Sequence, residues 1–236
     1  MTSRPKFRRA ETAGAEALPN GPGTIRKSSL SVSNRALRAL WGIVQLILFI
    51  PSPVPLHAWR RLLLRLFGAR IGQGCLIYPS ARIWAPWNLT MAEFSCIGPK
   101  VDCYTVDSVA IGAYASVSQY SFLCTAGHDV DSATLALVTA PITVEPFAWV
   151  AADCFIGPGV RIGEGAVVGA RSTAFRDIPP WHIVAGQPPR FIRKRSHAVK
   201  EACTNTAAST GIRSFRRCTG GCRPLVPPGH DSSEDA

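Results

Sequence analysis

The segment WVAADCFIGPGVRIGEGAVVGARS (residues 149–172) repeats a pattern every six residues. Aliphatic side chains recur at Val150, Ile156, Ile162 and Val168, and a glycine follows each of the last three. A helix repeats after about 3.6 residues and a strand alternates after two, so this period requires a chain that turns a corner after each short strand. Three such sides close one triangular coil. The period therefore predicts an all-β fold, a prism of stacked triangular coils.

The same period recurs earlier in the chain, with shifts of phase that predict loops at the corners of coils. The further runs are Ile71, Ile77, Ile83 and Leu89, then Ile97, Cys103 and Val109, then Ile111, Val117 and Leu123, and finally Val144. The residue two places before each following aliphatic position has a small or medium-sized side chain. These residues are Cys154, Val160, Ala166 and Ser172. The glycines after the aliphatic residues, such as Gly112 and Gly163, are expected to allow a tight or positive-φ backbone. A sandwich of ordinary strands is the alternative, but it predicts alternation by two and variable spacing.

Charge divides the chain of 236 residues into three parts. Residues 1–70 carry a net charge of +10, residues 71–189 carry −4, and residues 190–236 carry +5. Basic flanks around an acidic body favour phosphates or an anionic membrane surface as ligands, and no nucleic-acid-binding motif accompanies them. We therefore expect no nucleic-acid partner.

The N-terminal part predicts a disordered segment followed by helices. Residues 1–33 are rich in Pro, Gly, Ser and charge and are expected to be disordered. Residues 34–68 have a helical pattern, with Asn34 as a candidate N-cap and a break at Pro51, Pro53 and Pro55. Two interpretations are open, a helical pair that covers the first coil or an anchor that lies in a lipid interface. The pattern favours packing together with peripheral membrane contact.

The cysteines and the chain ends predict a cytoplasmic protein without a metal site. The apolar run follows more than thirty polar residues, so it does not resemble a secretory signal. Cys75, Cys103 and Cys154 occupy repeat positions, where they are expected to be buried without forming disulfides. Cys218 and Cys222 in the tail do not have zinc-knuckle spacing.

The β-helix is expected over residues 69–195, followed by a disordered tail at 196–236.

The candidate chemistry lies where the repeat is interrupted after Leu123. The interruption contains His128, Asp129 and Asp131, and the repeat resumes near Ile142. A neutral imidazole can remove a proton from a hydroxyl as its oxygen attacks a carbonyl. His128 is therefore a candidate general base, and Asp129 or Asp131 could orient its ring. The alternative is a surface histidine in a polar loop.

Several motifs resemble those of the hexapeptide-repeat acyltransferases, and more narrowly those of the colanic acid biosynthesis acetyltransferases. They are the repeats themselves, the loop with His128, and the segments PSP (51–53), RIWAPWNL (82–89), WVAA (149–152), DIPP (177–180) and VAGQPPR (184–190). Together they cover about residues 34–195. The resemblance implies a left-handed parallel β-helix, although the usual crossover rule is right-handed.

The resemblance also implies a homotrimer with active sites between subunits and acetyl-coenzyme A as the donor. His128 would be the general base. The other roles implied by motif position are pantetheine contacts from Ala152 and Ala170, nucleotide-phosphate contacts from Arg176, Arg190 and Arg193, and an acceptor-side position for Trp149. An exposed basic face is the alternative for the arginines.

Two positions depart from the family pattern and concern the acceptor. Asp129 follows the histidine where sugar acetyltransferases of this type often have proline, and Tyr120 stands eight residues before it where asparagine is often found. These departures leave the histidine and the donor chemistry in place. Tyr120, Asp129 and Asp131 therefore join Trp149 as candidate acceptor-binding residues.

The sequence thus predicts an acetyl-coenzyme A-dependent O-acetyltransferase that acts on a sugar hydroxyl of an exopolysaccharide or cell-surface glycan precursor. We expect it in the cytoplasm, with peripheral contact at the inner face of the membrane. A non-catalytic β-helix scaffold is one alternative, and a serine, amine or other small acceptor is another. A zinc enzyme on the same prism would need three histidine ligands, and only His128 is well placed.

Overall fold

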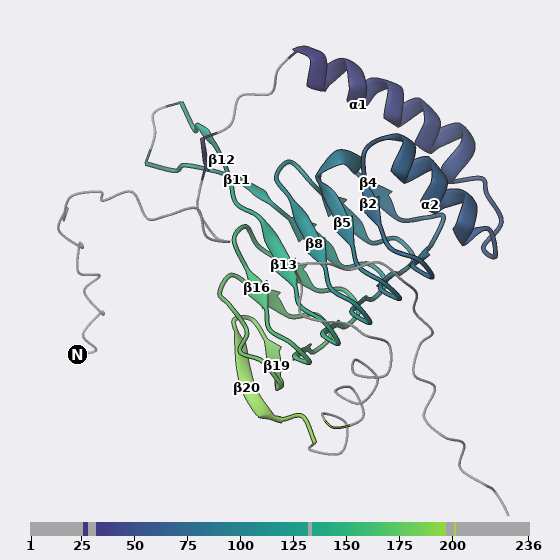
Figure 1. The fold of residues 1–236 in the computed structure, drawn as a ribbon. Helices are drawn as coiled ribbons and strands as arrows, with labels where there is room; N and C mark the ends of the chain where they lie inside the picture. Colours follow the sequence, from purple (N-terminus) through teal and green to yellow (C-terminus); the bar gives the residue numbers. More distant parts are fainter. Residues whose placement is uncertain (1–25, 28–31, 132–133, 197–200, 202–236) are drawn as a thin grey trace, which may run out of the picture.

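The computed structural model describes residues 26–27, 32–131, 134–196 and 201. These residues form a column of triangular coils with helices α1 and α2 over its first coil and strands β19 and β20 at its far end (Figure 1). Residues 1–33 and 196–236 were expected to be disordered, and most of them lie outside the described residues. Within those segments, Arg26–Lys27 forms strand β1 and helix α1 already begins at Val32.

Three sheets form the sides of the prism, and each is named here by its first strand. The β2 sheet contains Arg70–Ile71 (β2), Leu89–Met91 (β5), Val109–Ile111 (β8), Ile142–Val144 (β13) and Arg161–Ile162 (β16). The β3 sheet contains Leu76–Ile77 (β3), Cys96–Ile97 (β6), Ser116–Val117 (β9), Trp149–Val150 (β14), Val167–Val168 (β17), His182–Gly186 (β19) and Pro189–Lys194 (β20). The β4 sheet contains Arg82–Ile83 (β4), Asp102–Tyr104 (β7), Phe122–Cys124 (β10), Phe155–Ile156 (β15) and Thr173–Ala174 (β18). All pairings in these sheets are parallel except that of β19 with β20.

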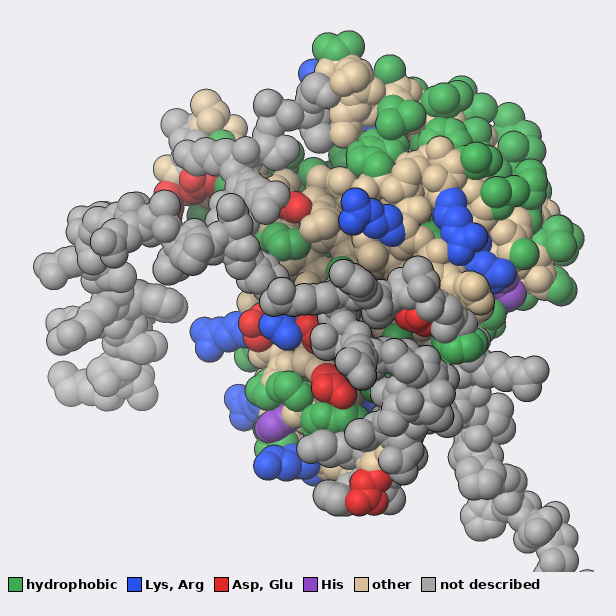
Figure 2. Space-filling model, viewed as in Figure 1, with side chains coloured by type: hydrophobic (Ala, Val, Ile, Leu, Met, Phe, Trp, Pro, Cys, Tyr) green, Lys and Arg blue, Asp and Glu red, His purple; other side chains and the backbone are tan. Residues whose placement is uncertain are grey.

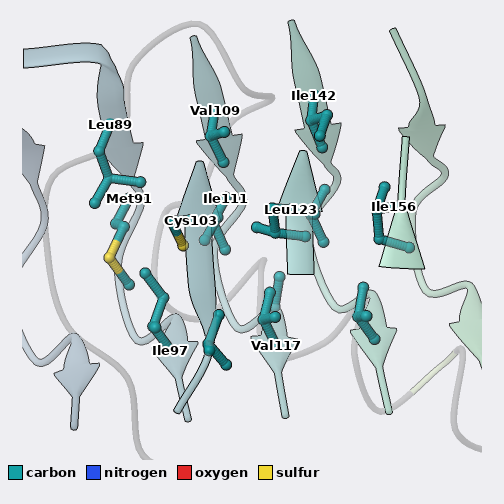
Figure 3. Close-up of a cluster of buried hydrophobic side chains, with 14 of the residues drawn as sticks. Leu89, Met91, Ile97, Cys103, Val109, Ile111, Val117, Leu123, Ile142 and Ile156 are labelled. Carbon is teal, nitrogen blue, oxygen red and sulfur yellow. The ribbon is translucent and has the colours of Figure 1, made fainter. Parts of the chain in front are cut away.

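The aliphatic residues of the repeat point into the prism and stack in columns (Figure 3). In the β3 sheet, Ile97 pairs with Val117 and Val117 with Val150, and all three side chains are fully buried. This arrangement confirms the predicted six-residue period. Leu89 and Val109 differ from the prediction, because extra residues at the preceding corners place them two positions before the column residues Met91 and Ile111. Both are still buried, and they stack on each other.

The glycines that follow the aliphatic residues allow close approach of neighbouring coils and not positive φ. A Cβ atom on Gly112 would lie 2.4 Å from the backbone nitrogen of Pro146, and one on Gly163 would lie 2.5 Å from that of Pro180. The left-handed conformation occurs three residues after the column aliphatic, where φ is 59° at both Tyr114 and Phe147. The prediction of tight backbone is therefore confirmed, whereas the positive φ belongs to a position that is mostly not glycine.

Two helical segments cap the first coil. They are α1 (Val32–Val44), which continues as a π-helical turn (Gln45–Phe49), and α2 (His57–Leu66). Trp41 and Phe49 are buried, and the Trp41 indole N–H donates a 2.7 Å hydrogen bond to the Ile83 carbonyl. The packing interpretation of residues 34–68 therefore agrees with the structure. Asn34 is not an N-cap, because it lies inside α1, where its side-chain oxygen accepts a hydrogen bond from Arg38.

A buried arginine fixes the proline-rich turn between the two helices. The Arg60 guanidinium donates to the carbonyls of Ile77, Pro53 and Val54 and to the hydroxyl of Ser52. Its side chain is fully buried, and a buried cation is tolerated only when its donors are paired in this way. The turn, α2 and the first coil therefore form one rigid unit.

The contact at Gly112 predicts a loss of stability in Gly112→Ala. The new Cβ atom would meet backbone atoms of the next coil, so the coils must separate, at a cost of about 1–3 kcal/mol. Gly42→Ala is the matched control, because nothing lies within 4 Å of its Cβ position in helix α1. Chemical denaturation should show this variant to be unchanged or stabilised by about 0.5–1 kcal/mol. Equal stability of the two variants would contradict the close-approach account.

The environment of His57 predicts a dependence of stability on pH. Burial lowers the pKa of His57 below its usual 6.5, and Arg60 and Arg61 lower it further against the opposing effect of the Ile77 hydrogen bond. Between the lowered pKa and 6.5 the folded state binds fewer protons than the unfolded state, so stability falls as the pH falls. Melting temperatures of the wild type and His57→Gln should therefore show a steeper loss below pH 6.5 in the wild type. Parallel curves would contradict this assignment.

Candidate active site

The interruption after Leu123 forms an antiparallel hairpin at the corner between the β4 and β2 sheets. Strand β11 (Ala126–His128) pairs with β12 (Leu137–Thr139), and His128 stands opposite Leu137. Strand β1 pairs with the other edge of β12. The hairpin projects from the prism (Figure 1), while the coil resumes at β13. A side chain on this hairpin can therefore reach beyond its own coil.

The hairpin itself orients the ring of His128. The Nδ1 atom lies 2.7 Å from the Leu135 carbonyl oxygen, and the ring is exposed. A carbonyl oxygen can only accept a hydrogen bond, so Nδ1 carries the proton in the neutral ring and Nε2 keeps its lone pair. This tautomer is the one required of a base that acts through Nε2.

The two nearby carboxylates are placed differently from the sequence-based suggestion that one of them orients the ring. The Asp129 N–H donates to the Ala136 carbonyl, and the Asp129 carboxylate accepts the backbone N–H of Asp131 at 3.1 Å. The contact that orients the imidazole comes from the Leu135 carbonyl instead. A backbone partner of this kind could not be identified from residue types, because it depends on the path of the hairpin.

An open groove lies at the corner between the β3 and β4 sheets. It has a volume of about 380 Å³. The structure brings three predicted site residues, Tyr120, Ala152 and Ala170, together in its lining. They occupy equivalent corners of successive coils, and the Tyr120 hydroxyl is 3.3 Å from the amine of Lys100. Small residues on the two later coils leave the groove open beside them.

The groove has polar walls that the sequence did not single out. Arg171 and Asp153 line it and form an ion pair with an N–O distance of 3.3 Å. Gln119 lines it too, and the Gln187 side chain donates to the Arg171 carbonyl at 2.8 Å. The available signal for Arg171 was its position directly after Ala170 in the repeat, at the corner of a coil.

The other predicted site residues are distributed around the later coils. Trp149 is half exposed on β14, and its indole N–H donates a 2.8 Å hydrogen bond to the Ser118 hydroxyl beside the groove corner. Arg190 lies on β20 opposite Ala185, and Arg193 lies opposite Ile183. Arg176 follows β18 and stands at the hairpin corner. The three arginines are therefore not on one element, because two lie on β20 and the third lies at the hairpin corner.

The two candidate parts of the site lie at opposite ends of the strands of the β4 sheet, that is, at the two corners that flank this side of the prism. The groove residue Tyr120 lies two residues before β10, and the hairpin with His128 begins two residues after it. The strands of this sheet therefore separate the histidine from the alanine-lined groove within one chain.

An aromatic ladder runs along the outer face of the same sheet. The rings of Trp84, Tyr104, Phe122, Phe155 and Phe175 follow one another with centroid separations of 5.2, 6.2, 5.5 and 5.4 Å. Arg38 stacks on the Trp84 end, and Phe175 at the other end is 65% exposed. An outward-facing aromatic strip of this length is typical of a surface that another protein chain covers.

Comparisons with known proteins identify relatives over most of the β-helix, although no family model matches the chain. The colanic acid biosynthesis acetyltransferase WcaF of Escherichia coli is 44% identical over 156 residues, which cover 66% of this chain and 86% of the relative. Galactoside O-acetyltransferase of E. coli is 33% identical over 124 residues, covering 51% of this chain and 55% of that protein.

Solved structures show the same fold. The hexapeptide-repeat acetyltransferase VCA0836 of Vibrio cholerae, crystallised with acetyl-coenzyme A, has a TM-score of 0.63 and 26% identity, covering 70% of this chain and 91% of its own. A galactoside acetyltransferase in complex with coenzyme A has a TM-score of 0.64 at 24% identity, covering 75% and 90% of the two chains. The chain belongs to the hexapeptide-repeat acetyltransferase family, in the group that contains the colanic acid biosynthesis acetyltransferases. The predicted family and the left-handed parallel β-helix are thereby confirmed.

The described residues contain neither a metal-binding cluster nor a membrane-spanning helix. Within these ranges no three His, Cys, Asp or Glu side chains form a group that could hold a metal ion. No helix of the described chain has the length and hydrophobicity needed to cross a bilayer. Cys75, Cys103 and Cys154 are buried, as predicted, and each is a free thiol. Cys218 and Cys222 lie outside the described residues.

The contact between His128 and Leu135 predicts the tautomer of the free enzyme. Two-bond 1H–15N spectra of protein labelled at histidine should show neutral His128 protonated at Nδ1. His182 provides an internal reference, because its Nδ1 lies 2.8 Å from the Pro180 carbonyl and should give the same pattern. A proton on Nε2 of His128 would contradict its assignment as a base in this geometry.

Proposed function

We propose that the protein transfers an acetyl group from acetyl-coenzyme A to a sugar hydroxyl of an exopolysaccharide or cell-surface glycan precursor, with His128 as the general base. The observation that carries this proposal is the hydrogen bond between His128 Nδ1 and the Leu135 carbonyl. It leaves the Nε2 lone pair exposed on a projecting hairpin. The relative named for colanic acid biosynthesis supports an acceptor of this class.

The reaction follows from that tautomer. Nε2 takes the proton of the acceptor hydroxyl while the hydroxyl oxygen attacks the carbonyl carbon of the thioester. The carbon–sulfur bond then breaks, and the leaving thiolate receives the proton from the imidazolium. The products are an O-acetyl ester and free coenzyme A. The Leu135 carbonyl holds the ring in this orientation during transfer.

The groove at the β3–β4 corner has the features expected of the donor site. Ala152 and Ala170 leave space on successive coils, which suits a narrow pantetheine arm. Arg171 lines the groove and Arg190 lies on β20 opposite Ala185, and both would supply cationic groups for the nucleotide phosphates. We propose that Arg176 and Arg193 take part in the same contacts, with Arg176 contributed from the hairpin corner of a neighbouring chain.

A closed homotrimer would join the two separated halves of the site. In such a ring, each chain places its hairpin corner against the groove corner of its neighbour. The two corners that flank the β4 sheet then each contact an adjacent chain. The β4 sheet then faces the ring axis, which would cover the aromatic ladder from Trp84 to Phe175. The outward-facing ladder, with Phe175 exposed at its end, therefore supports the trimer independently of the position of the histidine.

The acceptor would bind between the hairpin and the groove mouth. Trp149 offers a half-exposed indole held by Ser118, and aromatic faces commonly pack against sugar rings. Asp129 and Asp131 lie next to the base and can accept hydrogen bonds from sugar hydroxyls. Tyr120 lines the donor groove, so we place it where the donor and acceptor meet.

The role of His128 predicts that His128→Ala loses about 10²- to 10⁴-fold in kcat while coenzyme A binding persists. Steady-state acetyl transfer, isothermal titration with coenzyme A and light scattering measure activity, donor binding and assembly. Val130→Ala is the matched control, because this side chain is 82% exposed two residues away on the same hairpin. Full activity of a folded His128→Ala variant would remove the base assignment, and the absence of coenzyme A binding by the wild type would contradict the transferase.

A further inference from the structure

The helical cap carries a large apolar surface that faces away from the prism. Aliphatic side chains on α1, its π-helical turn and α2 gather at the first-coil end of the molecule, as Figure 2 shows in green. Leu46 is 66% exposed, Ile43 56% and Leu66 71%. We define the cap surface by six exposed aliphatic residues, which are Leu40, Ile43, Leu46, Ile47, Leu62 and Leu66. A surface of this kind normally lies against a partner or a membrane.

The cap surface is not needed for packing of the fold. Trp41, Phe49, Leu63 and Leu64 are the residues that α1, the π-helical turn and α2 bury against the first coil. The exposed leucines of α2 occupy the opposite arc of that helix, next to Trp59, whose indole N–H is bonded to the Leu48 carbonyl. Two helices therefore have one face in the core and a second apolar face outside it.

The charge around the cap surface identifies its partner. The sequence contains no Asp or Glu between Glu16 and Glu93, whereas α1 and α2 carry five arginines. Arg61 and Arg65 lie on one flank of the exposed arc of α2, and Arg35 is exposed on α1. Lys and Arg side chains show in blue along the border of the green area in Figure 2. An apolar face on helices that carry arginines and no acidic residue matches the acyl chains and anionic headgroups of a phospholipid bilayer.

We propose that the cap surface docks the protein on an anionic phospholipid bilayer without spanning it. No described helix is long and apolar enough to cross a membrane, so the helices would lie in the interface. A second copy of the chain is a poorer match, because it would bring arginines of the same sign together. The Arg60 network fixes α2 and the turn on the first coil, and the Trp41–Ile83 hydrogen bond fixes α1 there, which reduces the entropic cost of docking.

The proposed trimer would strengthen this docking, and this step alone rests on the proposed function. In a ring with parallel prism axes, three cap surfaces lie at the same end and face one plane. Three linked contacts raise the overall affinity far above that of one. The His128 sites would then stand at a fixed height above the bilayer.

Flotation of the full-length protein with vesicles tests the proposal. We expect it to float with vesicles of phosphatidylcholine and phosphatidylglycerol at about 7:3 and much less with phosphatidylcholine alone. The variant Ile43→Gln/Leu46→Gln/Leu66→Gln should bind the anionic vesicles at least about tenfold more weakly. All three side chains are more than half exposed, and thermal melting checks that the variant folds. Ile192→Gln is the control, because this side chain is equally exposed on β20 at the other end of the prism and should float like the wild type.

Three results would overturn the proposal. The first is a wild type that does not float, and the second is a triple variant that floats equally well. The third is a wild-type assembly in light scattering that is larger than a trimer and that the triple variant dissociates, because the cap surface would then be covered by another copy. Acetyl transfer to a soluble acceptor is measured in parallel. Retained transfer without flotation removes only the membrane proposal, whereas absence of transfer in a protein that floats removes only the proposed function.

Discussion

Stacking of inward aliphatic side chains on their equivalents in the next coil is the constraint on which the structure depends. Each side of the prism has room for one short strand, so its column residue must be followed by a corner. Gly112 and Gly163 show how little space remains between coils at those corners. Extra residues are accepted only where a coil turns, and the largest addition is the hairpin that carries His128. The packing thus decides where chemistry can be placed.

The separation of the hairpin and the groove gives assembly a direct part in the proposed chemistry. The corner that follows the strands of the β4 sheet holds the base, and the corner that precedes them holds the alanine-lined groove. A single chain cannot close that gap without disrupting the stacked columns. The aromatic ladder between the two corners offers the apolar contact that would bring a second chain to the correct place.

Much of the fold could be predicted from the sequence because the column positions carry aliphatic residues at a strict interval. The handedness came from resemblance, since periodicity does not contain it. The left-handed residues were missed because Tyr114 and Phe147 are not glycine, and their conformation is imposed by the corner. The aromatic ladder was missed because insertions change the phase, so its members are recognised as neighbours only after the coils are aligned. The Leu135 contact of His128 depends on the hairpin register, which residue types do not encode.

The central claim is that each site combines the histidine of one chain with the groove of another. Subunit mixing tests it most directly, using His128→Ala, which lacks the base, and Ala170→Trp, which fills the groove. Each variant alone should be inactive, whereas co-refolded mixtures should recover about a quarter of the wild-type sites, because some interfaces pair an intact histidine with an intact groove. Mixtures that stay as inactive as the separate variants would contradict the account and place the whole site within a single chain.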